Sequence, residues 1–376
     1  MDKAGILFVG DFGSAYPEKI ELDNSISELI SGSKYACVNF EGCLHQGKLI
    51  SPSQNPVPQS DLSPQWLTQA GFNIINLANN HTMDYGETGL KKTTTAFNKD
   101  ITLLGAGRWE EAYSLKTIRL ENHTIGLLAG TSSDFSALMN PWEDKKKDGC
   151  ACIFTHTFNE LVLFAKKDCD YLIILPHAGL EYIDIPIPVI REKYREFIDL
   201  GADAIIASHP HCPQGIEIYK DKPIFYSLGN FYFDGSYLNR TDSPKYWCHS
   251  VAVKIDIKNG VFIWETYPIT RNRHQLRLSQ DVSYLKHLDE ISSILRNDDK
   301  YIALLNDVTS KRAITIKSWF LNGLNAVEIN HSFSCLKQLL KAFLRGQPNN
   351  KIVLHQLREE SSHYVLKHYY EKQIKS

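Results

Sequence analysis

Two histidines separated by one proline give the first indication of chemistry in this chain. His209 and His211 flank Pro210 shortly after residues 205–207, an apolar run that predicts a short buried strand. Pro210 fixes its own φ and pushes the residue before it towards extended geometry. Neutral imidazole binds Zn, Fe and Mn, so the pair could hold a divalent metal ion at the end of the strand. The alternative is that one histidine caps the strand and the other lies on the surface.

Other predicted strands also end in side chains that can bind metal. These side chains share one position, just past an apolar run: Asp11, Glu41, Asn80 with His81, and His177. In α/β sheets, ligands bind at the carboxyl ends of the strands. Each residue alone could simply cap a loop. If all of them meet at one edge, they form a site for two metal ions bridged by a carboxylate.

Such a site points to displacement at phosphorus. Two metal ions about 3.5–4 Å apart can hold a bridging hydroxide and clamp the oxygens of an in-line displacement. His81 would lie beside the metals, where it could donate a proton or a hydrogen bond to the leaving oxygen. The alternative is that His81 only orients Asp84 or a backbone carbonyl group.

The elements that must position these residues alternate between strands and helices. Apolar runs predict strands, and the segments 63–71, 158–166 and 189–200 predict helices between them. This alternation predicts an α/β fold, a sheet covered by helices on both faces. Residues 251–257 and 261–267 flank Asn259-Gly260, which predicts a hairpin with a type I′ turn.

The pattern changes from about residue 284. Apolar residues recur at helical spacing in 285–295, again in 336–344, and the segment 352–374 is also helical in character. We therefore expect two parts, a domain over residues 1–283 and a helical C-terminal appendage over residues 284–376. We expect the appendage to contact a partner protein or a second copy of the chain.

Composition narrows the class of protein. The formal net charge of −2 gives no indication of binding to nucleic acid or to an anionic membrane. The eight cysteines form no CxxC pair and no disulfide-type spacing, so we expect reduced thiols and a cytoplasmic protein. No apolar stretch reaches the roughly 18 residues of a membrane-spanning helix.

Several motifs, taken in order, resemble one known family. They are Gly10-Asp11, Asn39-Phe40-Glu41, Asn79-Asn80-His81 with Asp84 and Gly86, Gly105-Ala106-Gly107, His177 with Gly179 and Glu181-Tyr182, Ser208-His209-Pro210-His211, and Tyr226-Ser227-Leu228-Gly229-Asn230-Phe231. This set resembles the CapA-type poly-γ-glutamate capsule biosynthesis family, within the calcineurin-like metallophosphoesterase superfamily. The resemblance covers about residues 4 to 270 and implies a four-layer αββα sandwich.

The resemblance also implies roles for individual residues. It implies two divalent metal ions, most simply Mn, Fe or Zn, with Glu41 as the bridging ligand. The implied metal ligands are Asp11, Glu41, Asn80, His177, His209 and His211. His81 would face the substrate as the catalytic group. We further expect Asn79, Glu181 and Asn230 to contact the substrate.

One position departs from the superfamily pattern. The superfamily usually opens with Asp-x-His, but Gly13 stands where that histidine is expected. One metal position therefore lacks an imidazole, and we predict two positions of unequal affinity.

These observations favour a metal-dependent phosphoester hydrolase, active in the biosynthesis of a capsule or another surface polymer. Its substrate would be a phosphorylated or polyanionic small molecule or polymer. One alternative is a hydrolase or transferase acting at an amide of a γ-glutamyl polymer. Another is a non-catalytic assembly subunit of a polymer synthesis complex that retains the metal site. His81 favours catalysis, because a purely structural site has little need of it.

Overall fold

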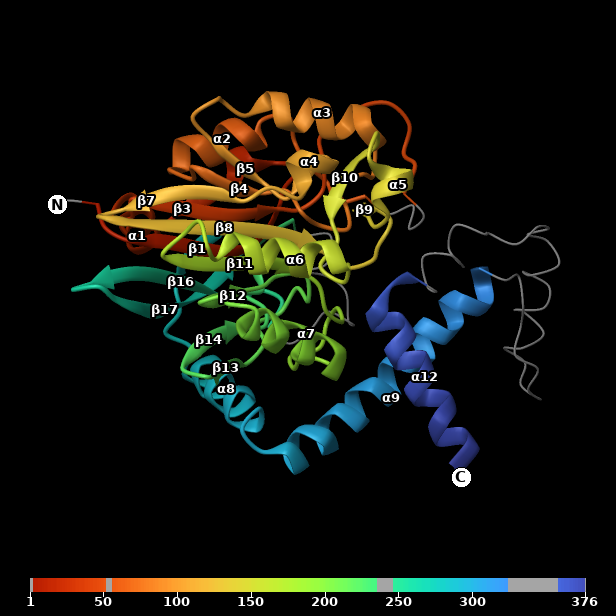
Figure 1. The fold of residues 1–376 in the computed structure, drawn as a ribbon. Coiled ribbons are helices and arrows are strands. Elements are labelled where there is room, and N and C mark those ends of the chain that lie inside the picture. The colour runs from red at the N-terminus through yellow and green to blue at the C-terminus, as the bar shows by residue number, and fades with distance from the viewer. Residues whose placement is uncertain (1–2, 52–55, 235–245, 324–357, 376) are drawn as a thin grey trace.

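The computed structural model describes residues 3–51, 56–234, 246–323 and 358–375. Two large β-sheets form its centre (Figure 1). The larger sheet contains, in spatial order, β2 (Glu21–Leu22), β18 (Gln275–Leu278), β17 (Val261–Asn272), β16 (His249–Lys258), β1 (Ile6–Gly13), β3 (Tyr35–Phe40), β4 (Ile74–Asn76) and β5 (Thr102–Leu104), and β15 (Asn230–Phe233) also pairs with β1.

The second large sheet is mixed, with parallel strands at its centre and an antiparallel strand at each edge. Its order is β13 (Ile216–Tyr219), β14 (Lys222–Phe225), β12 (Ala204–Ile206), β11 (Tyr171–His177), β8 (His123–Thr131) and β7 (Lys116–Leu120). A small third sheet contains β6 (Ala106–Arg108), β10 (Asp148–Ala151) and β9 (Ala137–Leu138).

The two large sheets pack face to face, and each is covered by helices on its outer face. In β1, Ile6 and Phe8 lie in the core between the sheets, whereas Leu7 and Val9 pack in the core beneath the outer helices. Side chains alternate between the faces of a strand, so a strand buried on both faces reads as a continuous apolar run. The apolar runs in the sequence arise in this way.

The outer helices complete four layers. Helices α1 (Asn24–Ser31) and α2 (Ser63–Ala70) pack on the larger sheet, and α6 (His156–Ala165) and α7 (Pro188–Asp199) pack on the second. Helix α3 (Gly86–Ala96) lies beside α2, and the short helices are η1 (Pro17–Lys19), α4 (Trp109–Ala112) and α5 (Pro141–Asp144) (Figure 1). Asp23 and Thr155 cap α1 and α6 by accepting hydrogen bonds from backbone N–H groups. The predicted αββα sandwich is confirmed.

The predicted hairpin is also confirmed. Lys258 pairs with Val261, and Asn259 and Gly260 have φ values of 53° and 75° between them. Positive φ at both central positions is the requirement of a type I′ turn.

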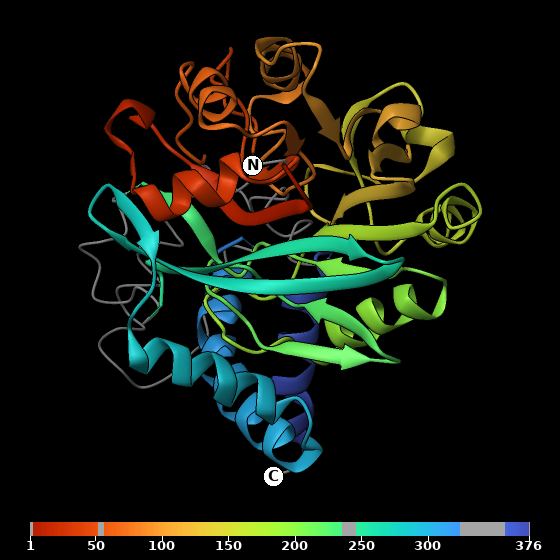
Figure 2. The ribbon, with the colours of Figure 1, turned by 90° about the vertical axis from the view of Figure 1, so that its left-hand side faces the viewer.

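Helices follow residue 281, as predicted. They are α8 (Val282–Ile294), α9 (Asp298–Gly323) and α12 (Glu360–Lys375), and they lie along one side of the sandwich (Figures 1 and 2). Ala313, Ile316 and Val365 are buried in the same core as α6 and α7. The predicted helix over 336–344 lies outside the described residues, and the division into two domains stays a prediction. No helix in the described ranges is long and apolar enough to cross a membrane.

Candidate metal centre

The strand ends that carry the candidate ligands meet in one place. Strands β1, β3 and β4 are parallel neighbours, so Asp11, Glu41 and Asn80 emerge at the same edge of the larger sheet. Strands β11 and β12 are parallel neighbours in the second sheet, and they deliver His177 and the His209–His211 pair. The two edges face each other across the sandwich.

A first set of donor atoms consists of Asp11, Glu41 and His211. One ligand atom from each of these buried residues lies within 4.8 Å of the other two. The His211 Nε2 atom lies 3.5 Å from Glu41 Oε1, and its Nδ1 atom lies 3.8 Å from Asp11 Oδ2. Two carboxylates and one imidazole therefore face a common point.

A second set of donor atoms lies beside the first. The His177 Nε2 atom is 3.0 Å from the side-chain oxygen of Asn80 and 3.1 Å from His209 Nδ1. Burial and the nearby His209 lower the pKa of His177 well below its usual value, which keeps the imidazole neutral. A neutral imidazole is the form that binds metal. Asp11 joins the two sets, because its Oδ1 atom is 3.8 Å from His177 Nδ1.

Glu41 shows that these residues fit a cation. Its side chain is fully buried, and neither of its carboxylate oxygens accepts a hydrogen bond from any residue in the described part of the chain. Burial, and then the neighbouring Asp11, raise the pKa of Glu41 well above its usual value. A buried carboxylate without hydrogen bonds costs free energy unless a cation compensates it. Mixed oxygen and nitrogen donors suit Mn, Fe or Zn better than Ca.

Asn39 orients donors in both sets, and the predicted site did not include it. Its side-chain NH2 group donates to Asp11 Oδ1 at 2.7 Å and lies 3.1 Å from His177 Nδ1. Residues of this kind fix the tautomer and direction of a metal ligand. The available signal was its position two residues before Glu41, in the same motif.

Asn230 has a similar relation to His211. Its side-chain oxygen lies 3.0 Å from His211 Nδ1, and its NH2 group donates to the His211 carbonyl oxygen at 3.2 Å. This contact turns the Nε2 atom of His211 towards Glu41. The geometry favours a positioning role for Asn230 over the predicted contact with substrate.

The Asn79 side chain connects two strand ends inside the protein. Its side chain is fully buried, accepts hydrogen bonds from the backbone N–H groups of Gly42 and His81, and donates to the Phe40 carbonyl oxygen. These bonds tie the end of β3 to the end of β4. They favour a structural role for Asn79 over the predicted contact with substrate.

His81 lies beside the donors and is more accessible than the carboxylate and imidazole donors. Its Nδ1 atom is 2.9 Å from Asp84 Oδ2, and its side chain is 14% exposed, whereas that of Asp84 is 1% exposed. Burial lowers the pKa of His81, but Asp84, together with the carboxylates of Glu181 and Asp134, outweighs this effect, and the pKa lies above its usual value. The imidazole is therefore oriented by Asp84 and still open on one side.

The family of the chain follows from a sequence comparison. Residues 17–235 match the family model of the bacterial capsule synthesis protein PGA_cap. The chain belongs to this family. The matched residues include every donor described above except Asp11.

Two relatives of this chain are CapA proteins from species of Bacillus. The chain is 30% identical over 283 residues to the PGA biosynthesis protein CapA of Bacillus subtilis (strain 168), covering 70% of each chain. It is 29% identical over 275 residues to the capsule biosynthesis protein CapA of Bacillus anthracis, covering 69% of this chain and 66% of that one. The chain thus spans about two thirds of these relatives.

A solved structure also matches. It is a putative 5′-nucleotidase from Staphylococcus aureus in complex with alpha-ketoglutarate, with a TM-score of 0.46 and 16% identity over 76% of this chain and 58% of that one.

In this PGA_cap protein, apolar side chains fill the space beside Gly13. A Cβ atom at Gly13 would lie 2.8 Å from Val57 Cγ1 and 3.1 Å from two ring atoms of Phe233. Val57, Phe233 and Trp247 form a small apolar cluster, and the Phe233 ring contacts the His211 ring at 4.8 Å between centroids. An imidazole at position 13 does not fit without repacking. The first donor set is therefore poorer in nitrogen ligands than the second.

The backbone is strained where it borders the donors. His209, His211 and Tyr182 have φ values of 104°, 57° and 65°. Residues other than glycine rarely adopt such values, and strain of this kind clusters at functional sites. The Tyr182 ring stacks on the His211 ring at 5.8 Å between centroids.

Glu181 lies at the rim of the centre. Burial alone would raise its pKa, but His209, His211 and Arg312 lower it below its usual value. Its side chain is 26% exposed. This position agrees with the predicted contact with substrate, which stays a prediction.

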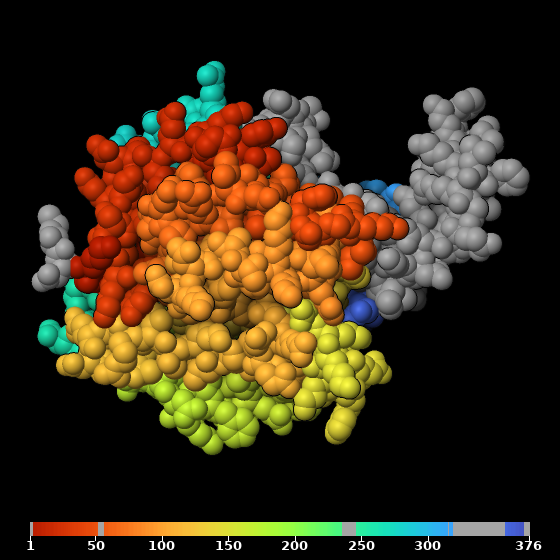
Figure 3. Space-filling view, turned by 90° about the horizontal axis from the view of Figure 1, so that it is seen from above, coloured from red at the N-terminus to blue at the C-terminus, as the bar shows by residue number. Residues whose placement is uncertain are grey.

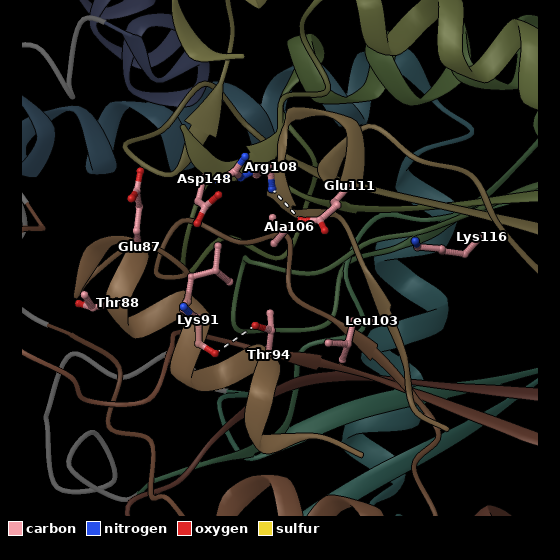
Figure 4. Close-up of a pocket in the computed structure, with 12 residues that line it drawn as sticks. Glu87, Thr88, Lys91, Thr94, Leu103, Ala106, Arg108, Glu111, Lys116 and Asp148 are labelled. Carbon is pink, nitrogen blue, oxygen red and sulfur yellow. Dashed lines mark hydrogen bonds between the residues drawn. The ribbon is translucent and has the colours of Figure 1, made fainter. Parts of the chain in front are cut away.

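A separate cleft of about 610 Å³ lies on the face that carries α3 (Figures 3 and 4). Charged residues of both signs line it, among them Glu87, Lys91, Arg108, Glu111 and Asp148. None of the residues that line it belongs to the two donor sets. Its mixed charge indicates no particular class of ligand.

Proposed function

We propose that this protein is a metal-dependent hydrolase of phosphoesters that acts in the biosynthesis of a capsule or another surface polymer. The observation that carries the proposal is Glu41, a buried carboxylate with unused oxygens in the first of the two donor sets. The family and the names of its relatives support the setting.

The donor sets suggest how two divalent ions would be held. Asp11 and His211 would hold one, and the second would be held by a set consisting of Asn80, His177 and His209. Glu41 would bridge the two positions. Such ions supply Lewis-acid polarisation of a phosphoryl group. Asn39 and Asn230 keep the ligand atoms pointed inwards.

His81 is the proposed proton donor. Asp84 accepts the Nδ1 proton, which leaves Nε2 as the atom that can give a proton to the leaving oxygen. A raised pKa increases the fraction of imidazolium near neutral pH.

The substrate, the location and the partners follow by inference. We propose a phosphorylated or polyanionic substrate, because the site would carry positive charge when loaded. We propose a cytoplasmic location, since all seven cysteines in the described ranges are free thiols.

We also propose that the C-terminal helices contact a partner or a second copy. Light scattering on the full-length chain tests for contact with a second copy, and we expect a molecular mass above that of one chain.

The test of function combines metal analysis with a substrate screen. Protein loaded with Mn²⁺ or Zn²⁺ is assayed against phosphomonoesters, phosphodiesters and γ-glutamyl peptides, with His209→Ala as the metal-deficient control. We expect hydrolysis of a phosphoester that His209→Ala abolishes. Cleavage of γ-glutamyl peptides alone would indicate an amide hydrolase. Bound metal without any turnover would indicate an assembly subunit.

A further inference from the structure

Helix α9 brings an arginine to the rim of the metal centre. The Arg312 Nη2 atom lies 3.5 Å from Glu181 Oε2, and the guanidinium lies over the Tyr182 ring, 5.3 Å from its centroid. Tyr182 also stacks on His211, so the same ring contacts both the guanidinium and a candidate metal ligand. Arg312 lies outside the residues that match the family model.

The surrounding contacts hold this arginine in place. The Tyr301 hydroxyl group on α9 donates to the Pro186 carbonyl oxygen at 2.9 Å, and the Ser361 hydroxyl group on α12 donates to the Gly179 carbonyl oxygen at 2.9 Å. Both acceptors belong to the segment that follows His177. The C-terminal helices are thus bonded to the segment that carries Glu181 and Tyr182. The Arg312 side chain remains 17% exposed, so solvent and ligands can reach it.

The chemistry of this arrangement suits an anion. A guanidinium presents five N–H donors in a planar fork that matches a carboxylate or a phosphate, and stacking on an aromatic ring restricts its orientation. Metal ions would bind the reacting group, and Arg312 contacts Tyr182, the ring that stacks on the candidate ligand His211. A substrate with a second negative group could contact both.

We propose that Arg312 is a specificity-determining residue that binds a second anionic group, carboxylate or phosphate, on the substrate. The inference rests on the proposed function, because it takes the reacting group to lie at the metal centre. Glu181 positions the guanidinium, and a bound anion shares it with that carboxylate. The substrates favoured would carry an anion at a fixed distance from the reacting phosphoryl group.

The binding of unreactive substrate analogues tests the proposed role of Arg312 without relying on turnover. Calorimetry on the metal-loaded full chain compares phenylphosphonate with 4-phosphonobenzoate and with 1,4-phenylenediphosphonate. We expect the wild type to bind at least one of the doubly anionic analogues about tenfold to a hundredfold more tightly, the range typical of a charge-assisted hydrogen bond. The two doubly anionic analogues distinguish carboxylate from phosphate as the second group.

Matched variants assign the preference to Arg312. Arg312→Gln should remove the preference for the doubly anionic analogues. The double variant Arg312→Gln with Glu181→Gln should remove it too. This double variant excludes the possibility that the loss comes only from repulsion by a Glu181 carboxylate left without its partner. Lys311→Gln is the control, because the neighbouring Lys311 side chain is 74% exposed and pairs with Asp307; it should keep the preference. Should Arg312→Gln fail to fold, Arg312→Lys decides, since it keeps the charge without the fork and should weaken the preference.

Equal binding of all three analogues by the wild type would overturn the inference, and so would a preference that survives in Arg312→Gln or stays undiminished in Arg312→Lys. Turnover of the corresponding phosphate esters tests the hydrolase proposal separately. If the wild type shows the preference, Arg312→Gln loses it, and no ester is turned over, the hydrolase proposal is contradicted. The role of Arg312 in binding the second anion then still holds.

Discussion

His81 and its partner Asp84 differ from the metal donors in what they can reach. All donors except Asn80 are almost fully buried, whereas His81 is partly exposed and is held on one side by Asp84. A residue that binds metal and a residue that moves a proton should therefore respond differently to mutation.

We predict that His81→Ala lowers kcat by about 10²–10⁴-fold, the range of general acid catalysis, without lowering metal content. The reason is that His81 is not among the converging donor atoms. Metal stoichiometry and kcat are measured on the same preparation, with His177→Ala as the contrasting variant that should lose both. Metal loss in His81→Ala, or full activity without the imidazole, would contradict this role.

A second prediction at this scale concerns Asn39. Its amide contacts donors in both sets, so Asn39→Ala should weaken metal affinity about 10–100-fold, as loss of an orienting residue typically does. Competition with a chelator measures the affinity. Asn122→Ala, in the turn between β7 and β8, is the control and should bind metal normally. An unchanged metal affinity in Asn39→Ala would show that Asp11 and His177 keep their orientation without the Asn39 amide.

At the scale of elements, the donors were predictable because each of them follows an apolar run. Parallel strands bring their carboxyl ends to one edge, so sequence order alone indicates that Asp11, Glu41 and Asn80 gather. The roles of Asn39 and Asn230 were not predictable in this way. Their partners His177 and His211 come from other parts of the chain, and the contacts depend on how the two sheets and the loops between them meet.

The segment after β8 provides a prediction on pH. Asp134 is buried and accepts hydrogen bonds from the Thr131 hydroxyl group and the Ser136 N–H group. Burial raises its pKa from 3.8 to about 7. A carboxyl group with a raised pKa in the folded state stabilises the fold while protonated. Its contribution is fully present below pH 3.8 and is lost as the pH rises through about 7.

We therefore expect Asp134→Asn to flatten the dependence of the free energy of unfolding on pH between about 4 and 7. Urea unfolding across this range, with a chelator present to remove metal effects, measures the slope. The exposed Asp168 gives the control variant Asp168→Asn, which should keep the wild-type slope. An unchanged slope in Asp134→Asn would show that Asp134 is ionised throughout.

At the scale of the whole molecule, the C-terminal helices pack on the sandwich and reach the rim of the candidate metal centre. The helical spacing of their apolar residues predicts a buried face but does not say which surface that face meets. The contact between Arg312 and Glu181 joins two distant parts of the chain, and no local pattern indicates it.

Two isoleucines on α9 test whether this helix is part of the folded body. Ile316 is 1% exposed within the core of α6 and α7, whereas Ile314 is 69% exposed. We expect Ile316→Ala to lower the free energy of unfolding by about 2–5 kcal/mol, and Ile314→Ala to change it by about 0.5 kcal/mol or less. Urea unfolding measures both variants. Equal effects would mean that α9 does not pack on the sandwich in solution.

The central claim is that two donor sets bridged by Glu41 bind metal ions, and anomalous diffraction from crystals grown with Mn²⁺ or Zn²⁺ tests it most directly. We predict a strong peak among Asn80, His177 and His209, and a weaker one between Asp11 and His211, with Glu41 between the two. The difference in occupancy follows from the apolar side chains packed around Gly13. Two equally occupied positions would contradict that role of Gly13. No peak among these donors with either metal, or a peak only elsewhere in the molecule, would contradict the metal centre itself.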